Sequence, residues 1–431
     1  MKEELARLDK AHFWHPFTQM QAWCDSDEDP LILASGKGAI LTDSVGRNYL
    51  DGNSSIWTNI HGHGHPTIDA AIRNQLERVA HTSALGFSNE PAIRLAARLV
   101  GLFPVDTLTR VFFSDDGSTA IECACKMVVQ YRQLTGEAER DLFVSFEGAY
   151  HGDTMGAASL GGIGVFHDRF AGSGYPMRRV NGFEELDSLV GEEIERLNAV
   201  IIEPLIRGAA GMKTWPEGML RKLREWCDRQ GVFLILDEVM TGFGRTGTMF
   251  ACEQEEVVPD FLCLAKGLTG GYLPLAATMT TERVFEAFLG EYEELKTFFY
   301  GHSYCGNPLG CAAALGNLQV FEEEDTLENL PGKVEALEEA LANLAGPVPH
   351  FGEIRQVGLI AGLDLVDAES GGELDWRNET GAEVCRRARH YGLLTRPVRD
   401  TLTLMPALCA SESQIVAMVE ALVRATADVL D

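Results

Sequence analysis

Lys266 is the residue whose setting most strongly suggests chemistry. It follows the apolar stretch FLCLA and precedes the glycine-rich segment GLTGGYLP. Removing a lysine amine from water disfavours its charged form and can make it a nucleophile. An apolar run, VFLIL, ends in Asp237, 29 residues before Lys266. Carboxylates at the ends of parallel strands point into the ligand crevice of an α/β sheet. Asp237 and Lys266 could therefore share a site, although the spacing alone is equally compatible with a solvated loop lysine.

A second candidate is GSTA (117–120), which follows the strand-like run TRVFFS and the turn DD. The backbone N–H groups at a helix start have no partner within the helix and attract phosphate groups. Ordinary N-capping by Ser118 or Asp116 explains the same residues. Taken alone, the motif favours capping.

Two further motifs are more typical of turns than of ligand sites. GFGRTG (242–247) is a literal GxGxxG, but VFLILDEVMT separates the strand from its first glycine, and no clear helix follows. A tight loop is therefore favoured over a dinucleotide site. HGHGHP contains His61, His63 and His65, but no cysteine or carboxylate lies at ligand-like spacing. It predicts a structural turn and no metal site.

Strand-like and helix-like segments alternate through most of the chain. Apolar runs of strand length occupy 109–114, 141–146, 198–203, 232–237 and 275–280, and helices are expected at 66–80, 90–103, 117–136 and 216–230. Continuous apolar strands alternating with helices predict an α/β fold whose mostly parallel sheet is covered on both faces. From about residue 325, helices at 328–345, 380–391 and 411–429 and an alternating segment at 354–367 predict a smaller α+β domain.

The composition narrows the class of protein. The 431 residues allow two or three domains. Lys plus Arg is 36 against 64 for Asp plus Glu, a net charge of −28, which argues against nucleic-acid and anionic-membrane partners. No apolar run is long enough to span a membrane, and MKEELARLDK lacks the apolar core of a signal peptide. Ten cysteines without a CxxC pair predict reduced thiols in a cytoplasmic protein.

Together these segments resemble the class III (ω-type) aminotransferases, which use pyridoxal 5′-phosphate (PLP) on the fold-type I scaffold. The resemblance covers most of the chain, through DGNSSIWTNIHGHGHP, DDGSTAIECACKM, EGAYHGDTMGA, AVIIEP, LILDEVMTGFGRTG and LAKGLTGGYLP. DEVMTGFGRTG followed by LAKGLTGG is highly specific. The resemblance implies a large PLP-binding domain at 62–325 with a seven-stranded type of sheet. It also implies a discontinuous small domain, made of 1–61 and 326–431.

The resemblance also implies how the cofactor is held. Lys266 would bind the cofactor aldehyde as a Schiff base, and Asp237 would bond the pyridine nitrogen. Tyr150 and Val239 would lie on the two ring faces. A carboxylate beside the ring nitrogen favours its protonated, electron-withdrawing form. Lys266, once displaced by substrate, can act as general base and acid. Lys266, Asp237 and Tyr150 are therefore the expected catalytic residues.

Phosphate binding would use two segments of the chain. Gly117 and Ser118 would cradle the phosphate at the helix start. Gly301, His302 and Ser303 match the stretch that reaches the phosphate across a dimer interface. The resemblance thus implies a homodimer with shared active sites.

The resemblance implies substrate contacts as well, with Arg396 binding a substrate carboxylate. The expected substrate-facing residues are Phe17, Trp57, Tyr150, Gly301 and Arg396. Trp57 could instead belong to the core. Glu203 either touches the cofactor region or simply closes a strand, and Arg245 either pairs with a buried carboxylate or lines the substrate channel.

One branch of the family is matched more closely, through WHPFTQM (14–20), SSIW, YHGDT, HSYCGNPLGC and LTRPVRDTLTLMP. That branch converts 8-amino-7-oxononanoate to 7,8-diaminononanoate in biotin biosynthesis by a ping-pong reaction. The alternatives are transamination of another ω-amino acid or a diamine, an aminomutase reaction, and a non-catalytic binding role.

The amino donor, lysine or S-adenosylmethionine, is left open by the sequence. Phe17, Ile56-Trp57 and His302-Ser303 resemble the branch reported to use lysine, as do HTSALGFSN (81–89) and YEELKTFFYGHSY (292–304). Phe17 lacks a hydroxyl group, so it cannot donate a phenolic hydrogen bond to substrate. These residues favour lysine.

Overall fold

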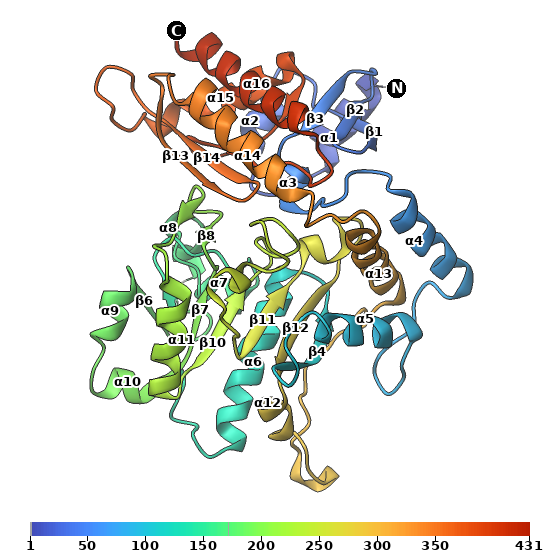
Figure 1. Ribbon diagram of the computed structural model, residues 1–431, viewed down its shortest axis with the longest axis vertical. Coiled ribbons are helices and arrows are strands. Elements are labelled where there is room, and N and C mark those ends of the chain that lie inside the picture. The colour runs from blue at the N-terminus through green and yellow to red at the C-terminus, as the bar shows by residue number, and fades with distance from the viewer. Residues whose placement is uncertain (1, 171) are drawn as a thin grey trace.

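The computed structural model describes residues 2–170 and 172–431. Its centre is a seven-stranded sheet in the order β4-β12-β11-β10-β7-β5-β6 (Figure 1). The strands are β4 (Leu108–Ser114), β5 (Leu142–Phe146), β6 (Met177–Val180), β7 (Leu197–Ile202), β10 (Phe233–Asp237), β11 (Phe261–Leu264) and β12 (Ala276–Thr281). Strand β12 runs antiparallel to both of its neighbours, β4 and β11. The other paired strands of this sheet are parallel. The expected mostly parallel α/β sheet is confirmed.

Both faces of the sheet are covered by packed side chains. In β10, Leu234 and Leu236 join the cluster that contains Leu223 of α11 (Met219–Gln230). Phe233 and Ile235 join the opposite cluster, which contains Ile121 of α6 (Gly117–Leu134). Successive side chains of a strand point to opposite faces, so a strand buried on both sides is apolar throughout. This explains the uninterrupted apolar run VFLIL.

Helices on the outside of the sheet include α4 (Pro66–Arg78), α5 (Glu90–Val100) and α13 (Pro308–Glu323). Sequence patterning placed the first two, although α5 ends three residues before the expected position. It missed α13. Eleven residues of that helix are buried, from Pro308 to Phe321, so it lacks the polar stripe that reveals a surface helix.

A second region lies above the large sheet in Figure 1. Its antiparallel sheet has the order β13-β14-β17-β16. The strands are β13 (Phe351–Val357), β14 (Ile360–Leu365), β16 (Pro397–Val398) and β17 (Thr401–Leu404), and the helices are α14 (Leu330–Ala340), α15 (Thr380–Ala388) and α16 (Glu412–Leu430). The smaller α+β unit is thus present, and the expected helix at 328–345 ends in a π-helical turn, Leu341–Ala345.

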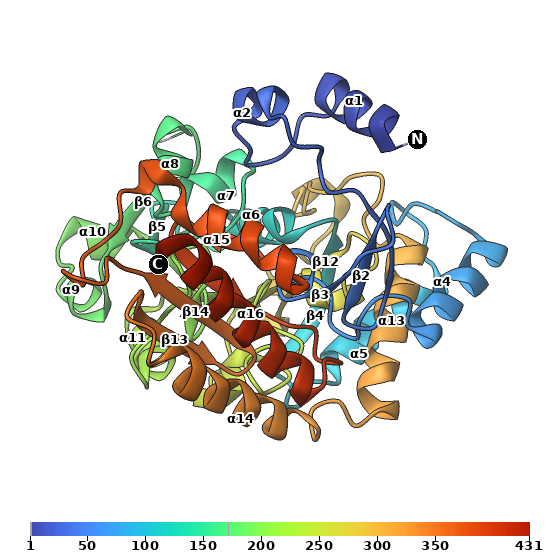
Figure 2. The same ribbon diagram turned by 90° about the horizontal axis from the view of Figure 1, so that it is seen from above.

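The N-terminal part of the chain shares a sheet with the C-terminal third. Strands β1 (Leu33–Lys37), β2 (Ile40–Asp43) and β3 (Asn48–Asp51) pair in order, and β3 pairs in parallel with β15 (Leu393–Leu394). The sequence did not predict these short strands. Helices α1 (Lys2–His12) and α2 (Met20–Asp25) lie at the margin of the molecule in Figure 2. The domain boundaries at 62 and 326 stay a prediction.

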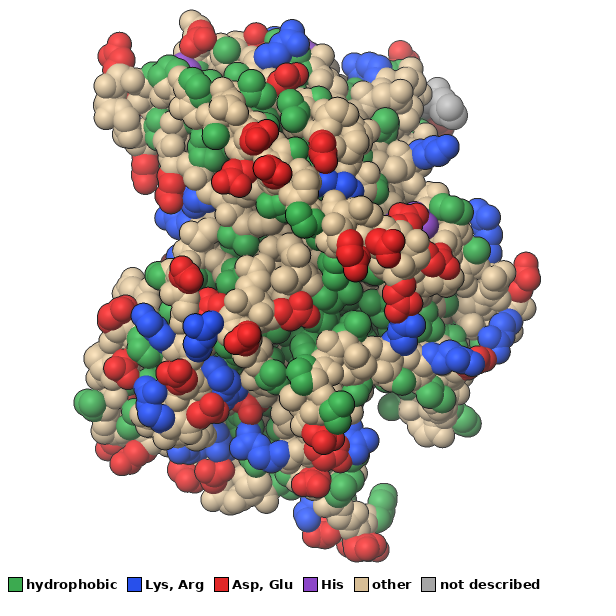
Figure 3. All heavy atoms as spheres, in the orientation of Figure 1, with side chains coloured by type: hydrophobic (Ala, Val, Ile, Leu, Met, Phe, Trp, Pro, Cys, Tyr) green, Lys and Arg blue, Asp and Glu red, His purple; other side chains and the backbone are tan. Residues whose placement is uncertain are grey.

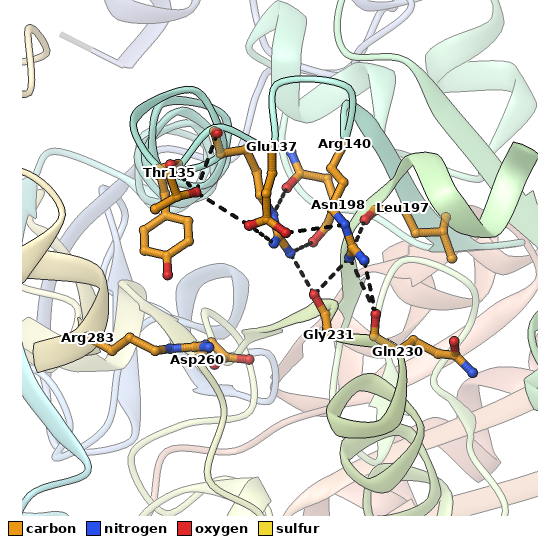
Figure 4. Close-up of polar contacts among 11 residues, drawn as sticks. Thr135, Glu137, Arg140, Leu197, Asn198, Gln230, Gly231, Asp260 and Arg283 are labelled. Atoms are coloured by element: carbon orange, nitrogen blue, oxygen red, sulfur yellow. Dashed lines mark hydrogen bonds and ion pairs between the residues drawn. The ribbon is translucent and has the colours of Figure 1, made fainter.

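The amino-terminal edge of the large sheet is closed by two arginines (Figure 4). Arg132, at the end of α6, donates to the Asn198 side chain at 3.1 Å, to Glu137 at 2.8 Å and to the Gly231 carbonyl at 2.8 Å. Arg140 also donates to the Gly231 carbonyl, at 2.9 Å. These bonds tie the end of α6 to the start of β7 and to the turn before β10.

The surface carries side chains of both charges. On the face shown in Figure 3, basic and acidic side chains are interspersed, without a large basic patch. In the described part of the chain, no helix has the length and apolar character of a membrane span. The cysteines are unpaired; Cys24 and Cys409 are exposed and the others are buried.

Candidate active site

Lys266 stands just after β11 and begins a 3-10 turn, Lys266–Thr269, with a φ of +43°. A non-glycine residue in this left-handed region costs roughly 1–3 kcal/mol and persists only where its surroundings impose it. Asn317 of α13 supplies part of that constraint, because its side-chain amide donates to the carbonyls of Gly267 at 2.9 Å and Leu268 at 3.2 Å. The turn that carries Lys266 is thus held from a helix that the sequence did not reveal.

The groups around the Lys266 amine have opposing effects on its pKa. Part of the side chain stays accessible, but burial of the amine lowers the pKa of Lys266, while the negative charges of Asp237 and Glu203 raise it. The Nζ atom lies 4.9 Å from the centroid of the Trp57 ring. Because β10 and β11 are parallel neighbours, Asp237 and Lys266 meet at the same sheet edge.

Asp237 is buried and has a partner that the sequence did not identify. The Nδ1 atom of His151 lies 2.8 Å from Oδ2 of Asp237, and Oδ1 accepts the backbone N–H of Val239 at 3.1 Å. His151 is itself buried, and its Nε2 has no hydrogen-bond partner among the described residues. The signal available in the sequence was its place in AYHGDT, directly after Tyr150.

Glu203 follows β7 and organises the loop that carries Tyr150. Its carboxylate accepts the backbone N–H groups of Tyr150 and Gly208, each at 3.0 Å. Burial raises the pKa of Glu203 to about 7; the His151 ring opposes this shift and the charge of Asp237 adds to it. Glu203 thus both closes β7 and holds the loop that carries Tyr150, and its place beside the cofactor stays a prediction.

Tyr150 lies near the N-terminal arm, to which Phe166 connects it. Its hydroxyl group donates to Asp153 at 2.6 Å, and burial together with Asp153 raises the pKa of Tyr150, which keeps the phenol neutral. The ring of Phe166 lies 6.4 Å from that of Tyr150 and 5.2 Å from that of Phe17. The arm thus approaches the site through Phe17, whose side chain is 54% exposed.

The start of α6 has both a cap and unused donors. Asp116, rather than Ser118, is the N-cap: its carboxylate accepts the Thr119 N–H at 2.9 Å in a capping box. The N–H groups of Gly117 and Ser118 have no recorded partner among the described residues, so capping leaves them available to an anion. A Cβ at Gly117 would lie 2.7 Å from Cγ1 of Val239, which explains the glycine.

The other residues expected to contact phosphate or substrate lie at or near the surface of the single chain. His302 lies beside the α6 start, with Nδ1 3.1 Å from Oδ2 of Asp115. Gly301 and Ser303 are exposed. Arg396 is also exposed, and its carbonyl accepts the Thr403 hydroxyl at 2.6 Å.

Arg245 bonds to backbone carbonyls and a hydroxyl group rather than directly to a carboxylate. Its fully buried guanidinium donates to the carbonyls of Pro406 at 2.7 Å and Asn59 at 2.6 Å and to the Ser54 hydroxyl at 3.3 Å. Burial lowers the pKa of Arg245 to about 10, where it remains a cation at neutral pH. Arg245 thus joins the loop after β10 to segments from both ends of the chain. The charge of the buried Asp51 carboxylate favours the protonated form of Arg245, as the structural interpretation expects, and a place along the substrate channel stays a prediction.

The three histidines of HGHGHP face different partners. His63 bonds Asp51 at 3.0 Å and His65 bonds Glu324 at 2.9 Å. His61 is buried 4.6 Å from the Phe321 ring, and burial lowers its pKa to about 3. Within residues 2–170 and 172–431 no group of His, Cys, Asp or Glu could hold a metal ion.

The site fits a cofactor with an aldehyde, a ring nitrogen and a phosphate. Lys266 provides the amine, and Asp237 provides a carboxylate at a strand end. The α6 start provides unused N–H groups beside Gly117, where a side chain would collide with Val239. This combination on a mostly parallel α/β sheet fits a pyridoxal-phosphate enzyme.

Comparison with known proteins agrees with this class. The chain belongs to the class III aminotransferases, whose family model matches residues 24–426, and it is therefore an enzyme that transfers amino groups. It is 48% identical to the adenosylmethionine-8-amino-7-oxononanoate aminotransferase of Nitratidesulfovibrio vulgaris, over 96% of this chain and 80% of that protein. The enzyme of the same name from Geobacter sulfurreducens is 43% identical, over 97% and 96%.

Solved structures agree on the fold. The Methanocaldococcus jannaschii enzyme of that name matches with a TM-score of 0.95 and 40% identity, over all of both chains. An amine transaminase from an uncultivated Pseudomonas species, solved in its PLP-bound form, matches with a TM-score of 0.88 and 34% identity, over 97% and 99%. The fold-type I architecture expected from the sequence is confirmed.

Proposed function

We propose that this aminotransferase uses PLP to convert 8-amino-7-oxononanoate into 7,8-diaminononanoate in biotin biosynthesis. The observation that carries the transamination chemistry is the Lys266 amine, held in a strained turn beside Asp237 and the Trp57 ring. The names of the similar enzymes supply the substrate.

When bound, PLP supplies an aldehyde and a ring that takes up the negative charge of a deprotonated substrate carbon. Lys266 would hold the cofactor through Nζ. When displaced by the substrate amine, it would take the proton from that carbon and deliver it to the carbon that had carried the cofactor aldehyde. The lowered pKa of Lys266 increases the fraction of neutral amine available for proton removal.

Asp237 would keep the ring nitrogen protonated through its carboxylate. His151, 2.8 Å away, fixes the carboxylate and would be a positioning residue. Gly117 and Ser118 would bind the phosphate with backbone N–H groups, and Tyr150 and Val239 would contact the two ring faces. A helix N-terminus binds phosphate without a cluster of basic side chains, which suits a chain with a net charge of −28.

Substrate binding would combine Arg396 for the carboxylate with the apolar surfaces of Phe17 and Trp57. A second chain would bring Gly301, His302 and Ser303 to the cofactor phosphate. The homodimer is supported by large apolar side chains exposed near these segments, among them Phe87 at 74% and Phe299 at 73%. Light scattering should give twice the mass of one chain; a single-chain mass would contradict the shared site. We also propose a cytoplasmic location, which fits the unpaired cysteines.

The names of the relatives specify adenosylmethionine as donor, whereas features of this chain favour lysine. Half-reactions separate the two: the PLP-loaded enzyme is mixed with either amine, and loss of the visible cofactor band is followed. The competent donor should bleach the band within seconds, and addition of 8-amino-7-oxononanoate should restore it. If 8-amino-7-oxononanoate fails to restore the band after reaction with either donor, the biotin-pathway substrate is contradicted and another ω-amino acid or a diamine is favoured.

A further inference from the structure

The segment Ser54–Trp57 has an unusual backbone. Its four residues have φ values of +45°, +51°, +67° and +66°. Consecutive L-residues strongly disfavour the left-handed helical region, and a β-branched residue such as Ile56 is a clear outlier there. Strain of this kind persists only where neighbouring groups impose it, and it collects at functional sites.

Hydrogen bonds from two parts of the chain impose this backbone. The buried Asp51 carboxylate accepts the Ser55 backbone N–H at 3.0 Å, the Ser55 hydroxyl at 2.9 Å and the His63 ring at 3.0 Å. The Ser54 hydroxyl donates to the Met405 carbonyl at 2.6 Å. The turn is thus fixed both to β3 and to the C-terminal third of the chain.

The turn ends with Trp57 against the catalytic lysine. The ring centroid of Trp57 is 4.9 Å from Nζ of Lys266. The indole N–H donates to Oδ1 of Asn53 at 2.8 Å, and Asn53 is 5% exposed. A buried indole takes its orientation from its apolar body and from the partner of its N–H group. Asn53 is the recorded partner here.

We propose that Asn53 is a positioning residue for this reaction: its amide oxygen fixes the Trp57 indole so that the ring face stays against the Lys266 amine. This inference rests on the proposed role of Lys266 in cofactor binding. The oxygen of Asn53 also lies 3.5 Å from the Thr403 hydroxyl, which donates to the Arg396 carbonyl. The same side chain therefore connects the lysine side of the site to the segment expected to bind carboxylate.

The position of the ring has a consequence for charge. The face of an indole attracts a cation, so the ring favours the protonated form of the nitrogen on Lys266. The other charged groups that act on this amine are Asp237 and Glu203, which favour the protonated form, and Arg245, which disfavours it. None of these three is altered by changing Asn53, so a shift can be assigned to the ring.

The test follows the pH midpoint of the visible absorption change in the cofactor-loaded enzyme. Asn53→Ala should lower the midpoint by about half a pH unit, the size expected for loss of one cation–ring contact. Asn53→Asp keeps an acceptor for the indole and adds negative charge, so its midpoint should equal or exceed that of the parent. Ser55→Ala is the matched control, because it removes a bond of the same turn without touching the indole, and its midpoint should not move.

A double variant separates positioning from general loss of structure. Trp57→Phe removes the indole donor, so Asn53→Ala should cause no further shift in that background. The inference is overturned if Asn53→Ala lowers thermal stability without moving the midpoint, or if its shift is undiminished in the Trp57→Phe enzyme. Absence of any visible band in the parent would refute the proposed cofactor role instead. The cofactor-free variants are then compared by the pH dependence of reductive methylation at the free Lys266 amine, measured by peptide mass spectrometry, with the same expected order and the same contradicting results.

Discussion

The two edges of the large sheet bury charged groups in contrasting ways. At the amino-terminal edge, Arg132 and Arg140 donate to backbone carbonyls and to the side chains of Asn198 and Glu137. At the carboxyl-terminal edge, Lys266 lies in a strained turn and its pKa is lowered by burial. Burial lowers the pKa of Arg132 as well as that of Lys266, so buried charge and a lowered pKa are common to both edges. The difference lies in the backbone: Arg132 belongs to the regular helix α6, whereas Lys266 begins a turn with a φ of +43°. A strained backbone at the charged residue, rather than buried charge itself, distinguishes the edge that carries the candidate site.

Substitution of Lys266 should have the largest effect. Lys266→Ala removes the covalent attachment and the proton carrier, so turnover should fall by more than about a thousandfold and the visible cofactor band should disappear. Thermal stability should hold or rise, because a buried amine is removed. Lys222→Ala, on the exposed side of α11, should leave the band and turnover unchanged. A Lys266→Ala enzyme that keeps the band would contradict the assignment.

A substitution at the amino-terminal edge should lower stability and leave activity unchanged. Arg132→Met leaves the buried Asn198 side-chain oxygen without its donor and the Gly231 carbonyl with Arg140 alone, which should cost about 2–4 kcal/mol of unfolding free energy. KM and kcat should be unchanged, since no cofactor or substrate group lies at that edge. Urea denaturation and steady-state kinetics measure the two quantities. A lower kcat under conditions where the variant is fully folded would show that the amino-terminal edge also affects catalysis, against the difference drawn between the two edges.

Glu203 should make stability depend on pH. Its pKa is raised from 4.5 to about 7 in the folded protein, so the folded state binds a proton more tightly than the unfolded chain does. This contribution is fully present below about pH 4.5 and is lost as pH rises through 7, by on the order of 3 kcal/mol. Denaturation between pH 5 and 8 should show a shallower fall for Glu203→Gln than for the parent. Equal slopes would show that Glu203 is not held in its protonated form.

The smallest effect compares one asparagine from each edge. Asn317→Ala removes the donor that holds the Lys266 turn, which should cost about 1–2 kcal/mol and reduce kcat severalfold. Asn198→Ala should cost similar stability and leave kcat intact. Equal kcat values for the two variants would mean that the Lys266 turn needs no support from α13.

Much of the fold could be predicted because its strands are buried on both faces. Continuous apolar runs identified five of the seven strands of the large sheet, including β10 and β7. The short strands β1 to β3 and the helix α13 could not be found this way: β1 is largely exposed, and α13 is apolar on all sides. Periodicity detects only elements with one buried face.

The candidate site could be predicted where a motif names a residue, and not where a contact creates its role. Lys266 and Asp237 stand in distinctive segments, and the structure brings them to one edge. His151 and Asn317 act through hydrogen bonds to residues 86 and 50 positions away. Asn53 bonds Trp57, only four positions away, but in a left-handed turn that is tied to the distant Met405 carbonyl. Arg245 was placed in a recognisable motif, yet its carbonyl partners come from distant segments. Such roles depend on tertiary packing, which spacing along one chain does not record.

The pairing of β3 with β15 sets the order in which the chain can be completed. Leu50 and Asp51 lie opposite Leu393 and Leu394, so the N-terminal strands must wait for nearly the whole chain before their sheet closes. The large sheet draws its strands from 108–281 and can form earlier during synthesis, because domains generally fold as units from the N-terminal side. Contacts of such long range slow folding. The turn that carries Trp57, anchored by the neighbouring Asp51, would therefore be among the last parts to take shape, and catalytic competence would mark the end of folding.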